Sequence, residues 1–184
     1  NSGYVMENLR VRAWDEGLGT CWISLDESLD VAAWVNGKAQ GHPVSLLAIG
    51  YPDMGVFRQD VLRKSSRKSL TELVFMEKWN QRCTMEELEL RGLSEILYYG
   101  KLAPSWGNRQ PWHFIIHKDK VCLSVHRLED EKRARIDAGI AMLYVQQAAH
   151  DKGISMKWEL ISPSDPLAEE LAVPEDHLLV AMFQ

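Results

Sequence analysis

Apolar residues near the start of the chain recur on one face of a helical repeat. Val5, Met6, Leu9 and Ala13 fall at helical spacing, which predicts an amphipathic helix. Gly17 follows shortly after, and a glycine in this place is a common helix stop. We therefore expect a first helix whose apolar face packs against the rest of the protein.

The central part of the chain alternates between strand and helix patterns. The apolar run 44–51 is closed by Pro52 and predicts a short buried strand. A helical segment is expected at about 69–80. Thr84 and Glu87 then form the pattern of a capping box, which predicts a helix start. The apolar face of that helix continues through Leu88, Leu93, Ile96 and Leu97.

A loop rich in turn-forming residues, 104–111, separates these helices from the last part of the chain. Beyond it we expect two strands joined by a short turn, then a helix that Gly153 ends, and a final strand. These four segments span 112–117, 121–125, 140–152 and 178–183.

Composition and charge narrow the functional classes. The 184 residues are 46% hydrophobic and 26% charged, as in ordinary globular proteins. The formal net charge of -5 opposes binding to nucleic acid. We expect no membrane span and no signal peptide. Cys21, Cys83 and Cys122 are too few and too scattered for a disulfide framework, so we expect a cytoplasmic location.

An internal repeat is the most informative long-range pattern. A shift of 136 positions superposes six identical residues, namely Gly3, Met6, Ala13, Asp15, Gly17 and Trp22 on Gly139, Met142, Ala149, Asp151, Gly153 and Trp158. The apolar run 46–49 then matches 178–181 with a small deletion. We interpret the chain as two related halves, 1–83 and 84–184, in one interlocked unit. The alternative is a chance likeness between two helix–strand units.

One contiguous motif carries the chemistry. Residues 102–114 read L-A-P-S-W-G-N-R-Q-P-W-H-F, and they resemble the A-P-S-x-x-N-x-Q-P-W-x-F loop of the nitroreductase family. Residues 17–24, G-L-G-T-C-W-I-S, resemble the segment that lies near the flavin in that family. Residues 67–72 resemble its basic R-x-P-L-E element, with Ser69 in place of proline. Together the three motifs and their connections cover most of the chain.

The resemblance implies an α+β fold, a mostly antiparallel sheet flanked by helices with a pseudo-two-fold repeat. It also implies an FMN-dependent oxidoreductase that transfers electrons from NAD(P)H through FMN to nitroaromatic, quinone or flavin acceptors. The motifs occur here in inverted order, which resembles members whose two fused halves mimic the family's homodimer. We therefore expect a pseudo-dimeric monomer that acts on a small-molecule acceptor, without nucleic-acid or membrane partners.

The same resemblance assigns the residues expected to hold FMN: Pro104, Ser105, Trp106, Asn108, Trp22, Ile23, Ser24 and Arg67. Their chemistry agrees with these roles, since a flavin needs apolar ring contacts, hydrogen bonds and a cation for its phosphate. The alternatives are ordinary turn residues in the loop, core tryptophans, and a solvated surface charge at Arg67. The cofactor supplies the redox chemistry, so no catalytic residue is assigned.

Two departures from the family pattern qualify this interpretation. The R-R-S-x-R phosphate motif is absent, and we expect it upstream of Asn1, in a chain that looks N-terminally truncated and whose 184 residues alone would bind FMN weakly or not at all. The second half carries Ser155, Met156 and Lys157 where the first has Gly19-Thr20-Cys21, so we expect one FMN site per chain. A flavin-binding or structural relative without turnover is the alternative function, and a relative with a changed reaction is a third.

No metal site is expected. His113 and His117 share a strand face, but the sequence offers no third ligand beside them.

Overall fold

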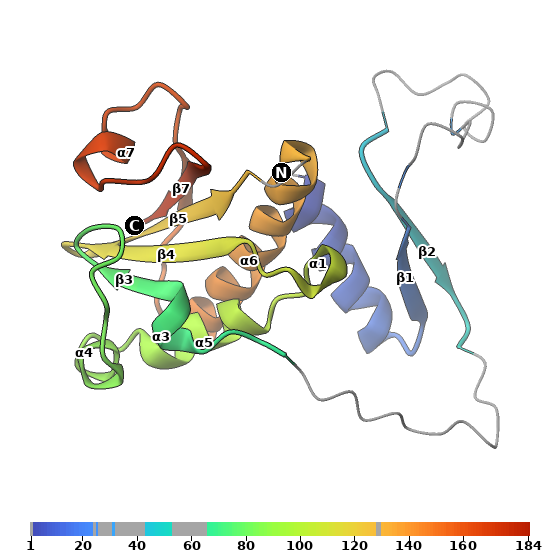
Figure 1. Ribbon diagram of the computed structural model, residues 1–184. Helices are drawn as coiled ribbons and strands as arrows, with labels where there is room; N and C mark the ends of the chain where they lie inside the picture. Colours follow the sequence, from blue (N-terminus) through green and yellow to red (C-terminus); the bar gives the residue numbers. More distant parts are fainter. Residues whose placement is uncertain (1, 24, 26–30, 32–42, 53–65, 128–129) are drawn as a thin grey trace.

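A computed structural model describes residues 2–23, 25, 31, 43–52, 66–127 and 130–184. Its main sheet has five strands in the order β3-β4-β5-β7-β6, with β3 parallel to β4 and the other neighbours antiparallel (Figure 1). The strands are β3 (Val74–Met76), β4 (Trp112–His117), β5 (Lys120–His126), β6 (Trp158–Leu160) and β7 (His177–Phe183). The fold is α+β, as the sequence predicts.

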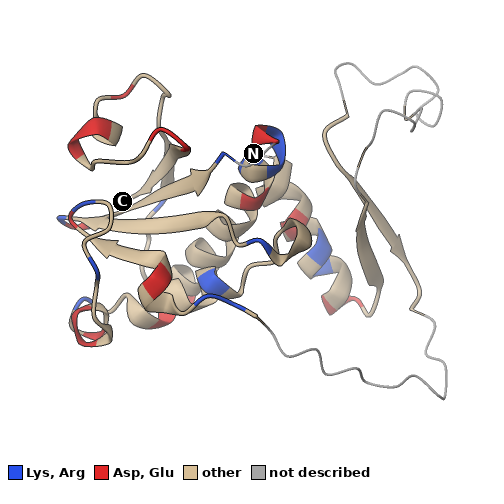
Figure 2. Ribbon diagram, viewed as in Figure 1, with Lys and Arg blue, Asp and Glu red and all other residues tan. Residues whose placement is uncertain are grey.

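Both faces of the five-stranded sheet are covered. Phe114, Ile116 and Leu123 point into the large core beneath the helices α5 (Ser94–Leu102) and α6 (Glu131–Asp151). The alternate residues Ile115 and Cys122 belong to a smaller cluster on the opposite face. That cluster includes residues of α7 (Leu167–Glu170) and of the turn after it. Charged residues lie mostly on the helices and turns, and the strands carry few (Figure 2).

Local signals place the helix ends next to the sheet. Thr84 Oγ1 accepts a hydrogen bond from the backbone N–H of Glu87 at 3.2 Å, and the Glu87 carboxylate accepts one from the backbone N–H of Thr84 at 2.8 Å. The predicted capping box at the start of α4 (Met85–Leu90) is thus confirmed. The predicted continuation into a single helix is wrong, because Gly92 adopts φ 69° and separates α4 from α5.

The predicted helix at 69–80 is also wrong. The chain forms only the short helix α3 (Leu70–Leu73) and then enters β3. Val74 and Phe75 are buried and pair with Phe114 and Ile115 of β4, so a β-branched and an aromatic residue gain sheet contacts that a helix would not provide. Tertiary pairing here outweighs the local helical pattern.

The predicted helix at 140–152 is real but much longer. Helix α6 begins at Glu131, because the Asp130 carboxylate accepts hydrogen bonds from the backbone N–H groups of Lys132 and Arg133. It ends before Gly153, which adopts φ 76°, as the sequence predicts.

Helix α1 (Ser2–Asp15) lies across α6 at a very close backbone approach. A Cβ atom on Gly3 would lie 1.9 Å from the carbonyl oxygen of Ile136, and one on Gly139 would lie 2.8 Å from the backbone nitrogen of Tyr4. Only glycine fits at either position. These two glycines are the pair related by the offset of 136 in the sequence.

The predicted apolar face of α1 is only partly correct. Val5 is 62% exposed and Leu9 48% exposed. The buried residues of this helix are instead Gly3, Glu7 and Ala13. The reason is the close crossing, which selects small residues on the contact face and buries a carboxylate that has several hydrogen-bond donors around it.

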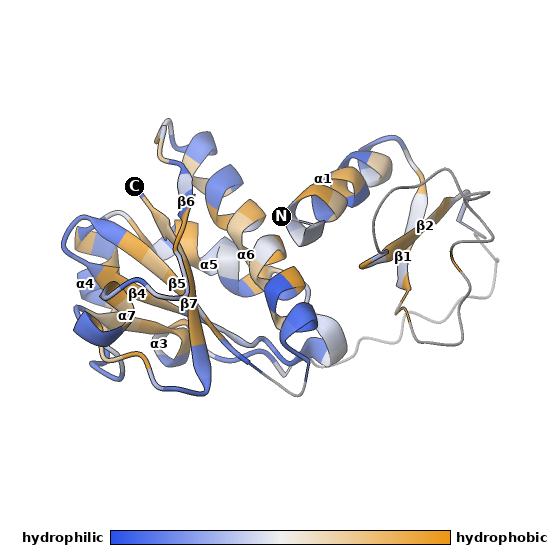
Figure 3. Ribbon diagram, turned by 90° about the horizontal axis from the view of Figure 1, so that it is seen from above, coloured by the Kyte–Doolittle hydropathy of each residue, from blue (hydrophilic) through white to orange (hydrophobic). Residues whose placement is uncertain are grey.

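A second, two-stranded sheet lies beyond α1, on the side away from the main sheet (Figures 1 and 3). Its strands β1 (Gly19–Ile23) and β2 (Leu46–Gly50) are antiparallel. The strand predicted at 44–51 therefore exists, but the prediction that it is buried is wrong, since no residue of β2 is buried. To be buried, strand β2 would need a second layer of structure on its outer face. The described part of the chain supplies none there.

The segments α1-β1-β2 and α6-β6-β7 share one order and one register. Trp22 pairs with Leu47 and Trp158 with Phe183, and both partners of the second pair lie 136 positions after those of the first. The strand ladders thus keep the offset without the deletion expected from the sequence. The predicted deletion is therefore wrong. The division into two halves remains a prediction.

None of the helices in the described residues is long and apolar enough to cross a membrane.

The helix crossing gives a stability prediction. We expect Gly3→Ala to lower the free energy of unfolding by about 1–3 kcal/mol, because the added Cβ forces α1 away from the backbone of α6. Urea denaturation measures the effect. Gly50→Ala is the matched control, since a Cβ there meets nothing within 4 Å. A Gly3→Ala protein as stable as wild type would contradict the described crossing.

Candidate functional site

A cleft of about 710 Å³ lies where three parts of the chain meet. The region of β1 and β2 forms one wall, the loop after α5 a second, and the first turns of α6 the third. The lining residues are Trp22, Ile23, Leu25, Val31, Pro43, Val44, Ser45, Pro104, Ser105, Trp106, Asp130, Lys132, Arg133, Ile136, Asp137 and Ile140. Segments far apart in the sequence therefore build one site.

The β1 wall is anchored by a buried carboxylate. Glu7 is 0% exposed and accepts hydrogen bonds from Arg10 Nη2 at 2.6 Å, Arg10 Nε at 2.8 Å, Trp22 Nε1 at 3.1 Å and Tyr144 Oη at 3.1 Å. The hydrogen bond to Glu7 raises the pKa of Arg10. Since Trp22 lies on β1 and Tyr144 on α6, this network fixes the cleft wall to both helices.

The second wall is the loop that carries the sequence motif. The Ser105 hydroxyl accepts a hydrogen bond from the backbone N–H of Gln110 at 2.9 Å and closes the loop on itself. Buried Gln110 accepts a hydrogen bond from the backbone N–H of Lys68 and donates one to the Asn108 carbonyl, each at 3.0 Å. The residues after position 65 thus brace the loop from outside the cleft.

The structure brings together five of the predicted flavin-contacting residues. Trp22, Ile23, Pro104, Ser105 and Trp106 all line the cleft. Ser24, the sixth residue of this predicted group, lies outside the described residues.

Two other predicted residues have different surroundings. Asn108 is exposed, and its side-chain Nδ2 donates to Ser66 Oγ at 3.4 Å. Arg67 Nη1 donates to the carbonyl oxygens of Lys101 and Ala103, both at 2.8 Å, and so satisfies the C-terminal end of α5. Neither side chain is among those that line the cleft.

The third wall was missed by the sequence analysis. Lys132, Arg133, Ile136 and Asp137 all precede the predicted start of the helix at residue 140, so their helical face was not recognised. The signal that could have revealed them is the N-cap Asp130 followed by residues with strong helix propensity.

Asp137 is the buried titratable group of the cleft. It is 3% exposed, and its carboxylate oxygens accept a hydrogen bond from the backbone N–H of Trp106 at 3.1 and 3.3 Å. Burial raises the pKa of Asp137 to about 7, and this hydrogen bond only partly opposes the rise. A carboxyl group that can hold or release a proton near neutral pH thus lies beside the motif loop.

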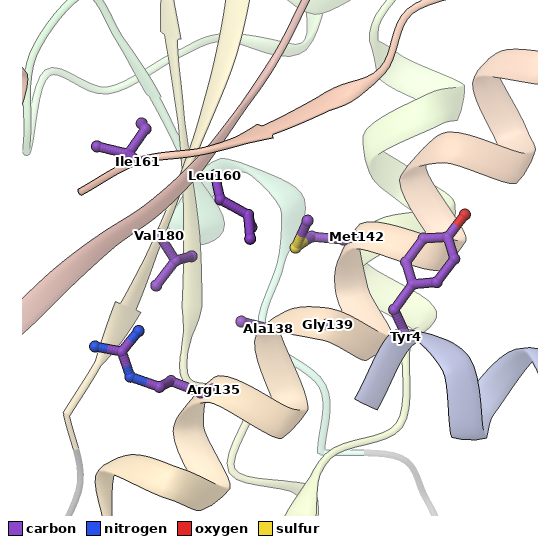
Figure 4. Close-up of a pocket in the computed structure, with 8 residues that line it drawn as sticks. All are labelled: Tyr4, Arg135, Ala138, Gly139, Met142, Leu160, Ile161 and Val180. Atoms are coloured by element: carbon purple, nitrogen blue, oxygen red, sulfur yellow. The ribbon is translucent and has the colours of Figure 1, made fainter. Parts of the chain in front are cut away.

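A smaller hollow of about 180 Å³ lies beside the helix crossing (Figure 4). Its lining residues are Tyr4, Arg135, Ala138, Gly139, Met142, Leu160, Ile161 and Val180. Tyr4 and Ile161 are the counterparts, at the offset of 136, of Ile140 and Leu25 in the large cleft. The two hollows are therefore related in sequence but very different in size.

The two histidines considered above have structural surroundings. The ring of His113 stacks on Phe75 with centroids 5.5 Å apart, and burial lowers the pKa of His113 to about 3. His117 Nδ1 lies 3.0 Å from a carboxylate oxygen of Glu77. Across the part of the chain that the structure describes, no group of three or more His, Cys, Asp or Glu side chains is arranged to hold a metal ion.

Comparisons with known proteins agree on one family. The sequence profile of the family described as "Putative TM nitroreductase" matches residues 1–149. A Thermotoga maritima structure, likewise described as a putative nitroreductase, superposes with a TM-score of 0.60 and 21% identity over 98% of this chain. This chain spans 62% of that protein.

Two clostridial structures match more loosely. A nitroreductase family protein of Clostridium novyi has a TM-score of 0.43 and 19% identity over 62% of this chain and 81% of its own. An FMN-dependent nitroreductase of Clostridium difficile has a TM-score of 0.44 and 19% identity over 65% of this chain and 82% of its own. No curated protein matches the sequence.

Asp137 gives a pH-dependent prediction. Its folded-state pKa of about 7 lies above the ordinary value of 3.8, so the folded state holds a proton that the unfolded state releases. The stabilisation from this proton is full below pH 4 and is lost as the pH rises to about 7. Asp137→Asn cannot ionise. Its stability relative to wild type should therefore rise by on the order of 3 kcal/mol between pH 4 and pH 8.

The measurement is chemical denaturation of both proteins across this range, in which the other titrating groups cancel. A difference in unfolding free energy that stays constant with pH would show that Asp137 is ionised throughout.

Proposed function

This chain belongs to the nitroreductase family, and on that premise we propose that it is an FMN-dependent oxidoreductase. Electrons would pass from NAD(P)H to a small nitroaromatic, quinone or flavin acceptor. The observation that carries the proposal is the cleft in which Trp22 and Ile23 face the loop residues Pro104, Ser105 and Trp106. When bound, FMN would supply the two-electron chemistry, and the protein would position it.

The lining of the cleft suits a flavin. Its volume of about 710 Å³ lies within the roughly 300–1,000 Å³ typical of sites for cofactors and small ligands. Ile23, Pro104, Ile136 and Ile140 provide apolar surface for a flat ring, and Trp106 adds an aromatic one. The Ser105 hydroxyl accepts a hydrogen bond from within the loop and so stabilises the loop conformation.

The residues of this chain have distinct proposed roles. Trp22 and Ile23 form the wall beside the ring, and Pro104, Ser105 and Trp106 form the opposite wall and exclude water. Ser24 is a proposed flavin contact on the basis of the sequence motif alone. Asn108 and Arg67 remain proposed members of the site. In the structure Asn108 contacts Ser66, and Arg67 contacts the end of α5, so both support the loop. Asp137 can hold a proton on its carboxyl group near the acceptor at neutral pH.

We further propose one FMN per chain, in a pseudo-dimeric molecule with halves 1–83 and 84–184. Three features support the two halves: the shared order of elements, the common register offset, and the pair of glycines at the helix crossing. The hollow related to the cleft has only about 180 Å³, below the usual range for a cofactor site. A second flavin would not fit there.

A flavin titration with subsequent reduction tests the function. We expect the full-length protein to bind FMN at 1:1, with quenched flavin fluorescence, and the bound flavin to lose its yellow colour when NADH or NADPH is added without oxygen. Bound flavin that neither donor bleaches would leave a flavin-binding protein without turnover. Absence of binding would favour a structural relative, and a ratio of two would contradict the single site.

Asn108 is tested by a matched pair of substitutions. Asn108 and Asn80 are both exposed asparagines with positive φ, 55° and 62°, so alanine causes similar backbone strain at each. If the Asn108 amide binds the flavin, Asn108→Ala should weaken FMN binding by about 1–3 kcal/mol, and Asn80→Ala should not. Equal FMN affinities in the two variants would reduce Asn108 to a turn residue.

A further inference from the structure

Two cations face the cleft from the first turn of α6, apart from the walls assigned to the flavin ring. Lys132 and Arg133 line the cleft together with the N-cap residue Asp130 (Figure 2 shows both signs of charge on this turn). Lys132 is exposed and the Arg133 side chain is 35% exposed, whereas Asp137 and Ile140 are buried. The cations therefore lie on the solvent side of the cleft, above a floor of buried residues.

Arg133 is held in place by two contacts. Its guanidinium carbon lies 4.6 Å from the centroid of the Trp106 ring, and its Nε lies 3.1 Å from a carboxylate oxygen of Asp130. Arg109 also contacts Trp106, at 4.5 Å. These contacts involve the flat face of the Arg133 guanidinium, over the Trp106 ring, and its Nε. They leave its two Nη groups without a hydrogen-bond partner among the described residues, in the fork geometry that binds anions bidentately.

Among its described lining residues the cleft has two cations, which lie on its solvent side, and two carboxyl groups, in a chain of net charge -5. The Asp130 carboxylate is already satisfied by the N-terminal N–H groups of α6 and by Arg133. Asp137 is buried beneath the cations, and burial raises its pKa to about 7, so it holds a full negative charge only above neutral pH. Positive charge beside a partly apolar cleft favours an anionic ligand with a flat, uncharged part.

Arg67, which the sequence motif predicts to bind the flavin phosphate, makes other contacts in the structure. Arg67 Nη1 is occupied by two carbonyl oxygens at the end of α5, both at 2.8 Å. Breaking these bonds would leave the carbonyls of a helix terminus without their partner. Arg133 lines the cleft and needs no such exchange.

We propose that Arg133, with Lys132 beside it, binds the phosphate monoester of a nucleotide in the cleft. This inference rests on the proposed function, because it assumes a flavin or nicotinamide nucleotide there. Two sources share this chemistry, namely the 5′-phosphate of FMN and the 2′-phosphate of NADPH. Both are monoesters that carry close to two negative charges at neutral pH.

The test compares ligands that differ only by that phosphate. FMN and riboflavin are titrated into wild type, Arg133→Gln and Arg135→Gln, and the KM values for NADPH and NADH are measured for the same three proteins. Arg135→Gln is the matched control, since it removes the same charge from the same helix at a residue that is paired with Glu131 and does not line the cleft. Arg133→Lys keeps the charge but loses the planar fork.

We expect Arg133→Gln to weaken FMN binding by about 10-fold or more while riboflavin binding stays the same, if the flavin phosphate is the ligand. If the NADPH phosphate is the ligand, the variant instead raises the KM for NADPH by a similar factor and leaves that for NADH unchanged. Arg133→Lys should fall between wild type and the glutamine variant, and Arg135→Gln should match wild type.

The inference would be overturned if Arg133→Gln changed FMN and riboflavin affinity equally or not at all, and likewise the KM values for NADPH and NADH. The proposed function would still stand if the wild type bound flavin. Failure of the wild type to bind either flavin would overturn the proposed function and the inference together.

Discussion

The close crossing of α1 over α6 is the constraint on which the site depends. At Gly3 and Gly139 the two backbones approach so closely that neither position has room for a Cβ atom. This approach places β1, which follows α1, beside the first turns of α6, and α6 in turn holds the motif loop through Asp137 and the Trp106 N–H. The cleft is therefore a product of helix packing.

Two buried carboxylates near this crossing have opposite roles because their surroundings differ. Glu7 has donors on both oxygens, from Arg10, Trp22 and Tyr144, so its hydrogen-bonding capacity is met, and removal of one partner would leave a buried polar atom unpaired. Asp137 has one backbone donor and no ion pair among the described residues, so burial dominates and raises its pKa to about 7. The first fixes the cleft wall, and the second gives the cleft a group that titrates near neutral pH.

The parts of the fold that could be predicted from the sequence are those whose signals are local. The capping box at Thr84 and the hairpin of β4 and β5 depend on residues a few positions apart, and the motif loop is contiguous. The errors occur where distant partners decide: Val74 and Phe75 join β4, and Val5 and Leu9 are exposed because glycine contacts α6 instead. For the same reason the motif predicted Trp22 and Trp106 as site residues, but not Arg133 or Asp137, which enter the cleft through the crossing.

The central claim is that one flavin lies between β1 and the motif loop, which the helix crossing brings together. Hydrogen exchange measured by mass spectrometry, with and without FMN, tests it most directly, because the method reports protection segment by segment. The account predicts slower exchange on FMN addition in both 19–23 and 103–110, and in the first turns of α6. Protection confined to one of these segments, or located only around the smaller hollow lined by Tyr4 and Leu160, would contradict it.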